Sequence, residues 1–189
     1  MGNDIDESWR RFLTPEMLRN NLITASLYIA AFELLKETIV ERIRDFFLLG
    51  RDESDPQFLT EYKSDVLSKN RSPVYSSLLW MRELKAIDES DIASFEAAKD
   101  CRNVIAHEMN RMLTDGLPAE WSECFGSMVA LLDKIEKWWI VEVEIPSNSD
   151  FDDQEIEMDD ILPGRIAGLH MMLDIALGSD EESQFYLDE

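Results

Sequence analysis

Arg102 and His107 are the side chains of the stretch KDCRNVIAHEMNRML, residues 99–113, whose types fit a shared catalytic task. Histidine exchanges a proton near neutral pH, while arginine keeps its charge and presents a planar fork of donors to phosphate oxygens. RNA carries its own nucleophile, the 2′-hydroxyl, so its cleavage needs a proton-transfer group and a phosphate clamp. This pair of residue types supplies both, and that chemistry requires no metal ion.

A long amphipathic helix, from near Ser90 to Gly116, is expected to carry this stretch. Its apolar stripe is formed by Phe95, Ala98, Ile105, Met109 and Met112. Arg102 falls inside that stripe, while Asn103 and His107 lie on the neighbouring polar face. Such a break in a pattern tends to mark a functional site. The alternative is an arginine whose stem packs on apolar neighbours while its head reaches water or a carboxylate.

The order RNVIAH, residues 102–107, resembles the R-x4-H signature of the HEPN superfamily. Glu108 extends it to IAHE, which is common in that group, and a long N-terminal helix carrying AFELLKE precedes it. The resemblance covers about residues 9–145 and leaves the acidic C-terminal part outside. Met109 stands where the family's toxins that are paired with a nucleotidyltransferase usually have tyrosine, which puts regulation through that tyrosine in doubt.

The resemblance implies a metal-independent endoribonuclease of the kind that acts as a toxin or defence effector. Arg102 and His107 would be its catalytic pair, with Asn103 as a supporting polar residue. On a regular helix these two side chains point about 140° apart, and a symmetric partner would solve this problem. The implied partners are an RNA substrate, a second copy of the chain in a homodimer, and a cognate antitoxin or regulator protein. No cofactor is implied.

Three charged residues are weaker candidates for the same site. Glu33 could orient the arginine or the histidine from a facing helix. It also belongs to a set of glutamates spaced at i, i+4, a pattern that normally forms a solvated helix face: Glu33, Glu37 and Glu41. The basic side chains of Lys36 and Arg44 would partly offset the repulsion among these carboxylates. Lys99 and Arg111 are candidate RNA contacts because their charges lie beside the motif.

Other reactive or aromatic residues are expected to be structural. His170, in RIAGLHMMLDIAL, should pack or flank a surface rather than catalyse. Trp138 and Trp139 could stack on bases, but a position at a helix end favours the core or an interface. Cys101 is expected in the core. Because Cys101 and Cys124 show no C-x-x-C pairing, both are expected to be reduced thiols of a cytosolic protein.

The charge of the chain limits its partners. The net charge is −22, and residues 145–189 carry 13 acidic groups and one basic group. Such a field repels nucleic acid at long range and argues against a general DNA binder. The acidic stretch lacks the glycine and ligand spacing of a calcium loop. No apolar run is long enough to span a membrane, and the first residues do not read as a signal peptide.

The element pattern predicts an all-α fold: a HEPN-like bundle of about five helices with a C-terminal helical extension. Thr14 with Pro15, and Ser72 with Pro73, mark two helix starts. Further helices are expected within residues 55–69, 90–116, 118–146 and 161–177. The alternating VEVEI could be a strand, but no other strand is expected to pair with it. Residues 9–145 are expected to form the bundle, and 146–189 an acidic linker, short helix and tail.

Two other functions stay open at this point. One is a catalytically silent HEPN-like bundle that acts as an interaction or nucleotide-binding module. The other is an acidic mimic of nucleic acid that occupies a basic partner surface, which the net charge permits. The acidic C-terminal segment could also fold back on the basic groups of the motif and compete with RNA. The simpler alternative is a tail that keeps the protein soluble.

Overall fold

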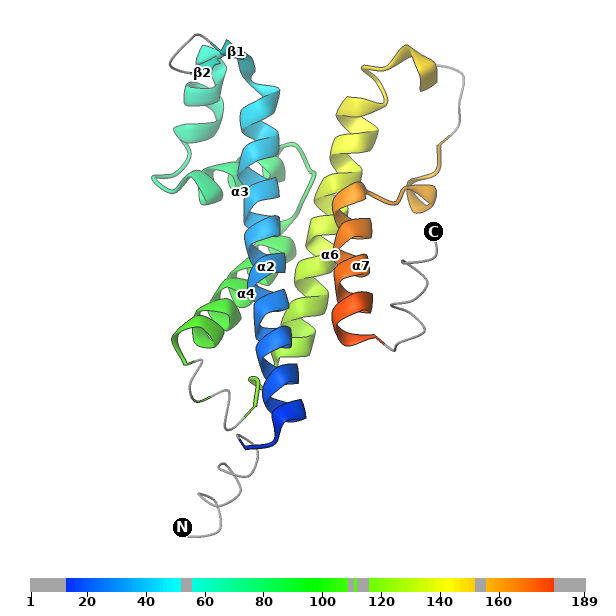
Figure 1. Cartoon of the computed structure of the whole chain (residues 1–189). Helices are drawn as coiled ribbons and strands as arrows, with labels where there is room; N and C mark the ends of the chain where they lie inside the picture. The colour runs from blue at the N-terminus through cyan, green and yellow to red at the C-terminus, as the bar shows by residue number, and fades with distance from the viewer. Residues whose placement is uncertain (1–12, 52–55, 109–110, 112–115, 152–155, 179–189) are drawn as a thin grey trace. The chain divides into compact units, whose positions relative to one another are not determined.

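The computed structural model of the chain describes residues 13–51, 56–108, 111, 116–151 and 156–178 (Figure 1). Its α-helices are α2 (Pro15–Phe46), α3 (Pro73–Glu83), α4 (Glu89–His107), α6 (Trp121–Trp139) and α7 (Gly164–Leu177). The remaining elements are the strands β1 (Leu48–Arg51) and β2 (Pro56–Phe58), the π-helical turns η1 (Tyr62–Leu67) and η2 (Ile140–Glu144), and the 3-10 turns η3 (Ser149–Phe151) and η4 (Met158–Asp160). The described residues are therefore mostly helical, which confirms the all-α class.

Two helix starts lie where proline indicates them. α2 begins at Pro15 and α3 at Pro73, and Ser72 before α3 has the extended backbone typical of a residue preceding a helix. Proline is tolerated there because the first N–H groups of a helix have no partner within the helix. α7 also falls within the range expected for the last helix.

A short hairpin corrects the expectation that no second strand exists. β1 pairs antiparallel with β2, with an irregularity between Leu48 and Gly50, and it follows α2, which ends at Phe46. Pro56 is tolerated because a two-stranded sheet leaves one side of each strand unpaired. The alternating segment VEVEI is not a strand. It continues α6 as the π-helical turn η2.

α4 is shorter than expected. It ends at His107, and Glu108 lies in a bend, although the apolar pattern continues toward Gly116. Residues 109–110 and 112–115 lie outside the described ranges, and nothing in the described residues explains the stop. The expected stripe positions Met109 and Met112 are among the residues left out. The stripe members Phe95, Ala98 and Ile105 are all buried, as the pattern predicts.

The chain packs as two compact units, each assembled from separate stretches. Unit 1 takes the described residues of Met1–Phe32, Glu96–Val129 and Leu162–Glu189, and unit 2 those of Glu33–Phe95 and Ala130–Ile161. The limits of the units fall inside α2, α4 and α6. The domain boundary expected after Ile145 stays a prediction. None of the helices in the described ranges is both long enough and apolar enough to cross a membrane.

Unit 2 is built around aromatic rings. Trp80 of α3 stacks on Trp139 of α6, with centroids 6.3 Å apart and planes inclined by 21°. Phe47 meets Trp80 edge-on at 5.9 Å. Trp139 is buried and Trp138 half-buried, which confirms the structural role expected for these tryptophans. Such rings bury large apolar areas and prefer offset or tilted contacts like these.

Unit 2 also holds a buried ion pair. Arg42 of α2 pairs with Glu136 of α6 and, at 2.5 Å, with Glu144 of η2. The Glu136 side chain is only 1% exposed, whereas Glu144 is 49% exposed. Because a carboxylate is costly to remove from water, the ion pair with Arg42 offsets part of the cost of burying Glu136.

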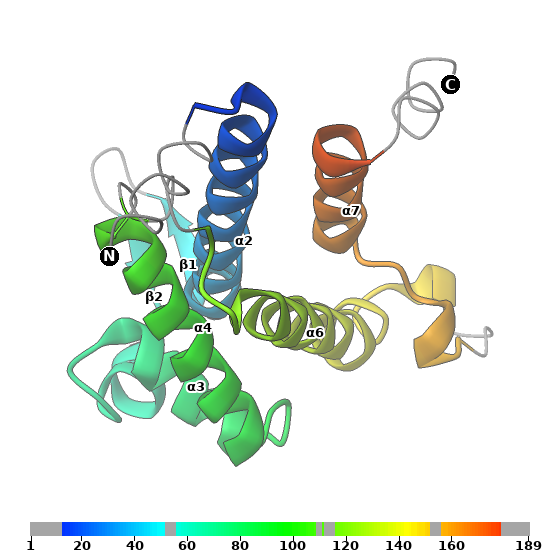
Figure 2. The same cartoon turned by 90° about the horizontal axis from the view of Figure 1, so that it is seen from below.

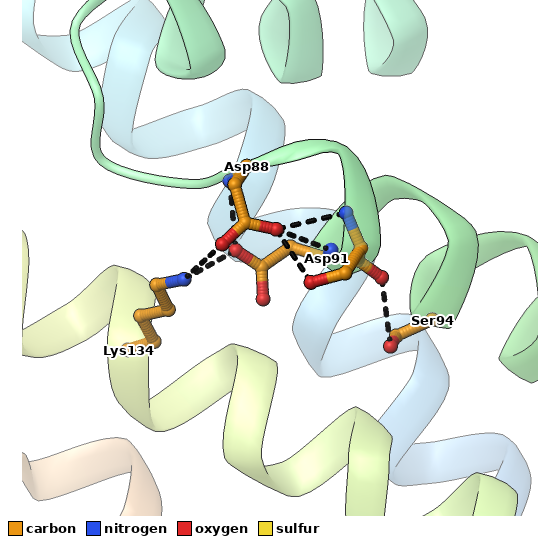
Figure 3. Close-up of polar contacts among 5 residues, drawn as sticks. Asp88, Asp91, Ser94 and Lys134 are labelled. Carbon is orange, nitrogen blue, oxygen red and sulfur yellow. Dashed lines mark hydrogen bonds and ion pairs between the residues drawn. The ribbon is translucent and has the colours of Figure 1, made fainter.

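A polar network fixes the start of α4 (Figure 3). The Asp88 carboxylate accepts the backbone N–H of Ser90 at 2.8 Å and of Asp91 at 3.2 Å, and the Asp91 carboxylate accepts the N–H of Asp88 at 2.8 Å. Lys134 of α6 pairs with both carboxylates. This reciprocal arrangement is a capping box, so the helix starts one residue before the expected Ser90.

Hydrogen bonds from the Ser90 side chain and from the backbone lower the pKa of Asp88 to about 2. Ionised Asp88 therefore adds stability that is fully present above its unfolded pKa of about 3.9 and is lost as the pH falls toward 2. We expect Asp88→Asn to lower the midpoint of thermal unfolding at pH 5–7, and this deficit to shrink below about pH 4. Calorimetry across pH measures the effect, with Asp100→Asn as the matched loss of one exposed charge on the same helix. A deficit that is constant down to pH 2 would contradict the assignment.

Candidate functional site

Arg102 lies half-buried on the part of α4 that belongs to unit 1. Its guanidinium carbon is 5.9 Å from the centroid of the Phe32 ring on α2, within the range of a cation–π contact. A guanidinium on an aromatic face keeps its charge while its stem is covered. The break in the apolar stripe is therefore filled by an arginine packed on an aromatic ring.

His107 is exposed and is the last residue of α4. The N–H of Glu108 donates to the carbonyl oxygen of Val104 at 2.8 Å and closes the final turn. Val104 itself is 40% exposed, so an apolar side chain lies at the surface one turn before the histidine. An imidazole in this place meets solvent and any large molecule bound to this end of the helix.

Burial separates the two candidate catalytic residues on α4. Arg102 packs against Phe32, while the His107 side chain faces solvent, which agrees with a divergence of about 140° on a regular helix. Asn103 is half-buried between them in sequence. Within one chain, the two side chains therefore lie on the same helix and point in different directions.

Tyr28 holds this part of α4 in place. It is fully buried, and its hydroxyl donates to the carbonyl oxygen of Ala98 at 3.2 Å. Its ring lies 5.8 Å from that of Phe125 on α6. Tyr28 therefore joins α2, α4 and α6 within unit 1, where the three helices come together (Figure 2). The hydrogen bond fixes α4 one turn before Arg102.

Each of the weaker candidates is in an ion pair with a residue three positions away in the sequence. Lys99 pairs with Glu96, Arg111 with Glu108 at 2.9 Å, and Glu33 with Lys36 at 2.7 Å. Glu33 belongs to unit 2, and its expected role of orienting the arginine or the histidine stays a prediction. Glu41 likewise pairs with Arg44, so basic neighbours partly offset the negative charge of the glutamates on α2, as expected. Lys99 and Arg111 must exchange a carboxylate for phosphate in order to bind RNA.

The residues expected to be structural are placed accordingly. His170 is exposed on α7, and Cys101 is buried. No group of three or more histidine, cysteine or acidic side chains in the described ranges is arranged to hold a metal ion. Residues 152–155 and 179–189 of the acidic C-terminal segment 145–189 lie outside these ranges, and the expected competition of this segment with RNA stays a prediction.

The chain matches no family model, no curated protein and no solved structure at a significant level. The class that the structure defines is an all-α protein with an arginine and a histidine on one helix.

Sequence reasoning missed the neighbours that position the site. Phe32 gave no signal, because an aromatic residue in a helix pattern indicates only a core position. The pattern of α2 likewise indicates no more than a core position for Tyr28, and its hydrogen bond to Ala98 joins residues 70 positions apart. The capping box was readable in principle, since Asp88 and Asp91 have the spacing of a box and precede an apolar run.

Proposed function

We propose that this protein is a metal-independent endoribonuclease of HEPN type, with Arg102 and His107 as its catalytic pair. The observation that carries the proposal is the placement of these residues on α4: an arginine held on the Phe32 ring, and an exposed histidine at the end of the same helix. A packed guanidinium has a restricted set of positions, which suits a phosphate clamp. A solvent-facing imidazole suits proton transfer.

The reaction follows from the groups present. His107 accepts the proton of the 2′-hydroxyl, and the 2′-oxygen attacks the adjacent phosphorus. Arg102 binds the non-bridging oxygens and opposes the charge that develops on them. The bond from phosphorus to the 5′-oxygen breaks, and that oxygen takes up a proton. The products are a 2′,3′-cyclic phosphate and a 5′-hydroxyl end.

A homodimer is part of the proposal. The two side chains of one chain diverge, and a twofold axis near α4 would set Arg102 of one copy against His107 of the other. The exposed Val104, between Arg102 and His107 in the motif, would supply an apolar contact for such an axis. Asn103, beside the arginine, would bind a phosphate or sugar oxygen.

The first experiment separates this chemistry from other nuclease activity. Purified protein is incubated in EDTA with an RNA and with a DNA of the same sequence. We expect cleavage of the RNA alone, with cyclic phosphate and 5′-hydroxyl ends detected by mass spectrometry. Equal cleavage of the DNA, or activity abolished by EDTA, would count against a reaction that uses the 2′-hydroxyl without metal.

Mixing two inactive variants tests the shared site. If Arg102 and His107 act across a dimer, a mixture of Arg102→Ala and His107→Ala regains activity, because each mixed dimer contains one complete pair. We expect recovery of roughly a quarter of the wild-type rate, the share of intact sites after free exchange of subunits. A mixture as inactive as its components would place both groups of the site in one chain.

A role as toxin or defence effector, held in check by a cognate antitoxin or regulator, follows from the same resemblance. A cell in which the wild-type chain is induced should stop growing, whereas a cell expressing His107→Ala should not. The measurement is growth after induction, with equal protein levels verified by immunoblot.

The net charge of −22 favours a second candidate, an acidic mimic that occupies a basic surface on another protein. A mimic requires neither Arg102 nor His107. Binding to a basic partner that survives loss of both residues and falls steeply with salt would support it. A silent HEPN-like module would instead need the bundle and no cleavage chemistry.

A further inference from the structure

α7 is apolar on every side. All of its 14 residues are described, and polar side chains occur at three positions: Arg165, His170 and Asp174. A helix that is apolar all round normally has packing partners all round. One side of α7 has them, because Ile166 and Leu169 are buried. The opposite side leaves Met171, Met172 and Ile175 exposed by 43%, 45% and 51%.

The exposed side of α7 has a small half and a large half. Gly164, Gly168, Met171 and Ile175 lie on one face, because steps of four and three residues return to the same side of a helix. A methyl group added at Gly164 or Gly168 would meet no atom within 4 Å outside its own stretch of helix. Packing within the described residues therefore gives no reason for glycine at 168, although an interior glycine weakens a helix relative to alanine. What glycine permits is the close approach of another backbone.

We propose that this face of α7 binds the same face of a second copy of the chain, with the two helices antiparallel about a twofold axis. One register sets Gly168 of one copy opposite Met171 of the other and, one turn further out, Gly164 opposite Ile175. Each large side chain then meets a glycine, so the two helices approach closely without a gap. A parallel pair would instead set methionine against methionine and leave a gap between the glycines.

The charge of the chain agrees with this occupant. The four residues of the face are uncharged, whereas the whole chain has a net charge of −22. A basic partner would find no carboxylate on this face, while two acidic copies can approach where like charges are absent. Because the rest of each copy still repels the other, screening by salt should strengthen the contact. The contact uses neither Arg102 nor His107, so it does not rest on the proposed ribonuclease function or on the dimer near α4.

Gly168→Ala tests the close approach, because its effects on folding and on association have opposite signs. The added methyl group has room in the single chain and favours the helix, so the variant should unfold about 2–4 °C higher than the wild type in dilute solution. The same methyl group would hold the paired helices apart and should raise the dissociation constant at least about fivefold. Gly126→Ala is the matched control, because Gly126 lies inside α6 with the same free space. It should raise the unfolding midpoint without changing association.

Sedimentation velocity of the purified full chain measures association, from about 1 to 500 µM protein and at about 0.05 and 0.5 M salt. We expect the wild type to associate as its concentration rises, and more strongly at the higher salt. A sedimentation coefficient that does not change with concentration would overturn the proposal. So would Gly168→Ala associating as tightly as the wild type, or an equal weakening in Gly126→Ala.

Hydrogen exchange locates the contact. Amides of residues 164–177 should exchange more slowly as the wild type is concentrated, since pairing suppresses local opening. Met171→Lys should abolish this slowing, because pairing would bury a charge at a position that is exposed in the single chain. Slowing confined to residues 96–107 would place the association on α4 and refute a contact through α7. Exchange of residues 164–177 that is slow at every concentration would show that the chain itself covers this face, which also refutes it.

Discussion

Replacing His107 by alanine is expected to lower RNA cleavage about 10²–10⁴-fold while leaving the fold intact. The imidazole is the proposed proton acceptor, so its loss removes general-base catalysis. Its side chain is exposed at the end of α4 and fills no core space. Stability should therefore change by no more than about 0.5 kcal/mol. Cleavage rates in EDTA and thermal unfolding of the same preparations measure the two effects.

His170→Ala is the matched control for this variant. His170 is the other histidine of the chain and is also exposed on a helix, but it lies on α7, away from the motif in sequence. We expect its loss to leave cleavage within about twofold of wild type. If both histidine variants cleave RNA like the wild type, the activity belongs to a contaminant or to another site.

Arg42→Ala is expected to cost about 3–5 kcal/mol of the free energy of unfolding. The substitution leaves the Glu136 carboxylate, which is 1% exposed, without its arginine partner. A buried charge that loses its partner retains the full cost of leaving water. Urea or guanidinium unfolding followed by circular dichroism gives the difference.

Two further variants show whether burial of Glu136 is the cause. Arg44→Ala removes an arginine from the same helix, but its partner Glu41 is about one-third exposed, and the loss should be at most about 1 kcal/mol. Arg42→Met combined with Glu136→Leu removes both charges and should recover most of the stability lost in Arg42→Ala. A double variant as unstable as Arg42→Ala would mean that packing, rather than the loss of the arginine charge beside the Glu136 carboxylate, sets the cost.

The helices that could be predicted are those with a start signal next to a long apolar repeat. Pro15 and Pro73 mark the starts of α2 and α3, because a proline at the first position costs no hydrogen bond. The hairpin was missed because its strands are short and carry little alternation. The segment VEVEI, by contrast, suggested a strand where none exists. Its alternation is short, and because it directly follows α6, the helix continues through it as a π-helical turn.

Only the part of the candidate site that lies on a single helix could be predicted from the sequence. The position of Arg102 inside an apolar stripe was readable, because the residues that define the stripe lie on the same helix. The partners that give the arginine its setting come from elsewhere in the chain: Phe32 provides a ring, and Tyr28 anchors the backbone of α4. Such contacts depend on how helices pack, which the pattern of a single helix does not specify.

The most direct test compares RNA cleavage in EDTA by the wild-type chain and by the double variant Arg102→Ala/His107→Ala, each purified by gel filtration. The activity must follow the protein peak, and circular dichroism must show equal helix content in the two samples. The proposed function predicts cleavage by the wild type, with a cyclic phosphate end, and none by the double variant. Equal cleavage by both proteins, or no cleavage of any RNA by the wild type, would contradict it.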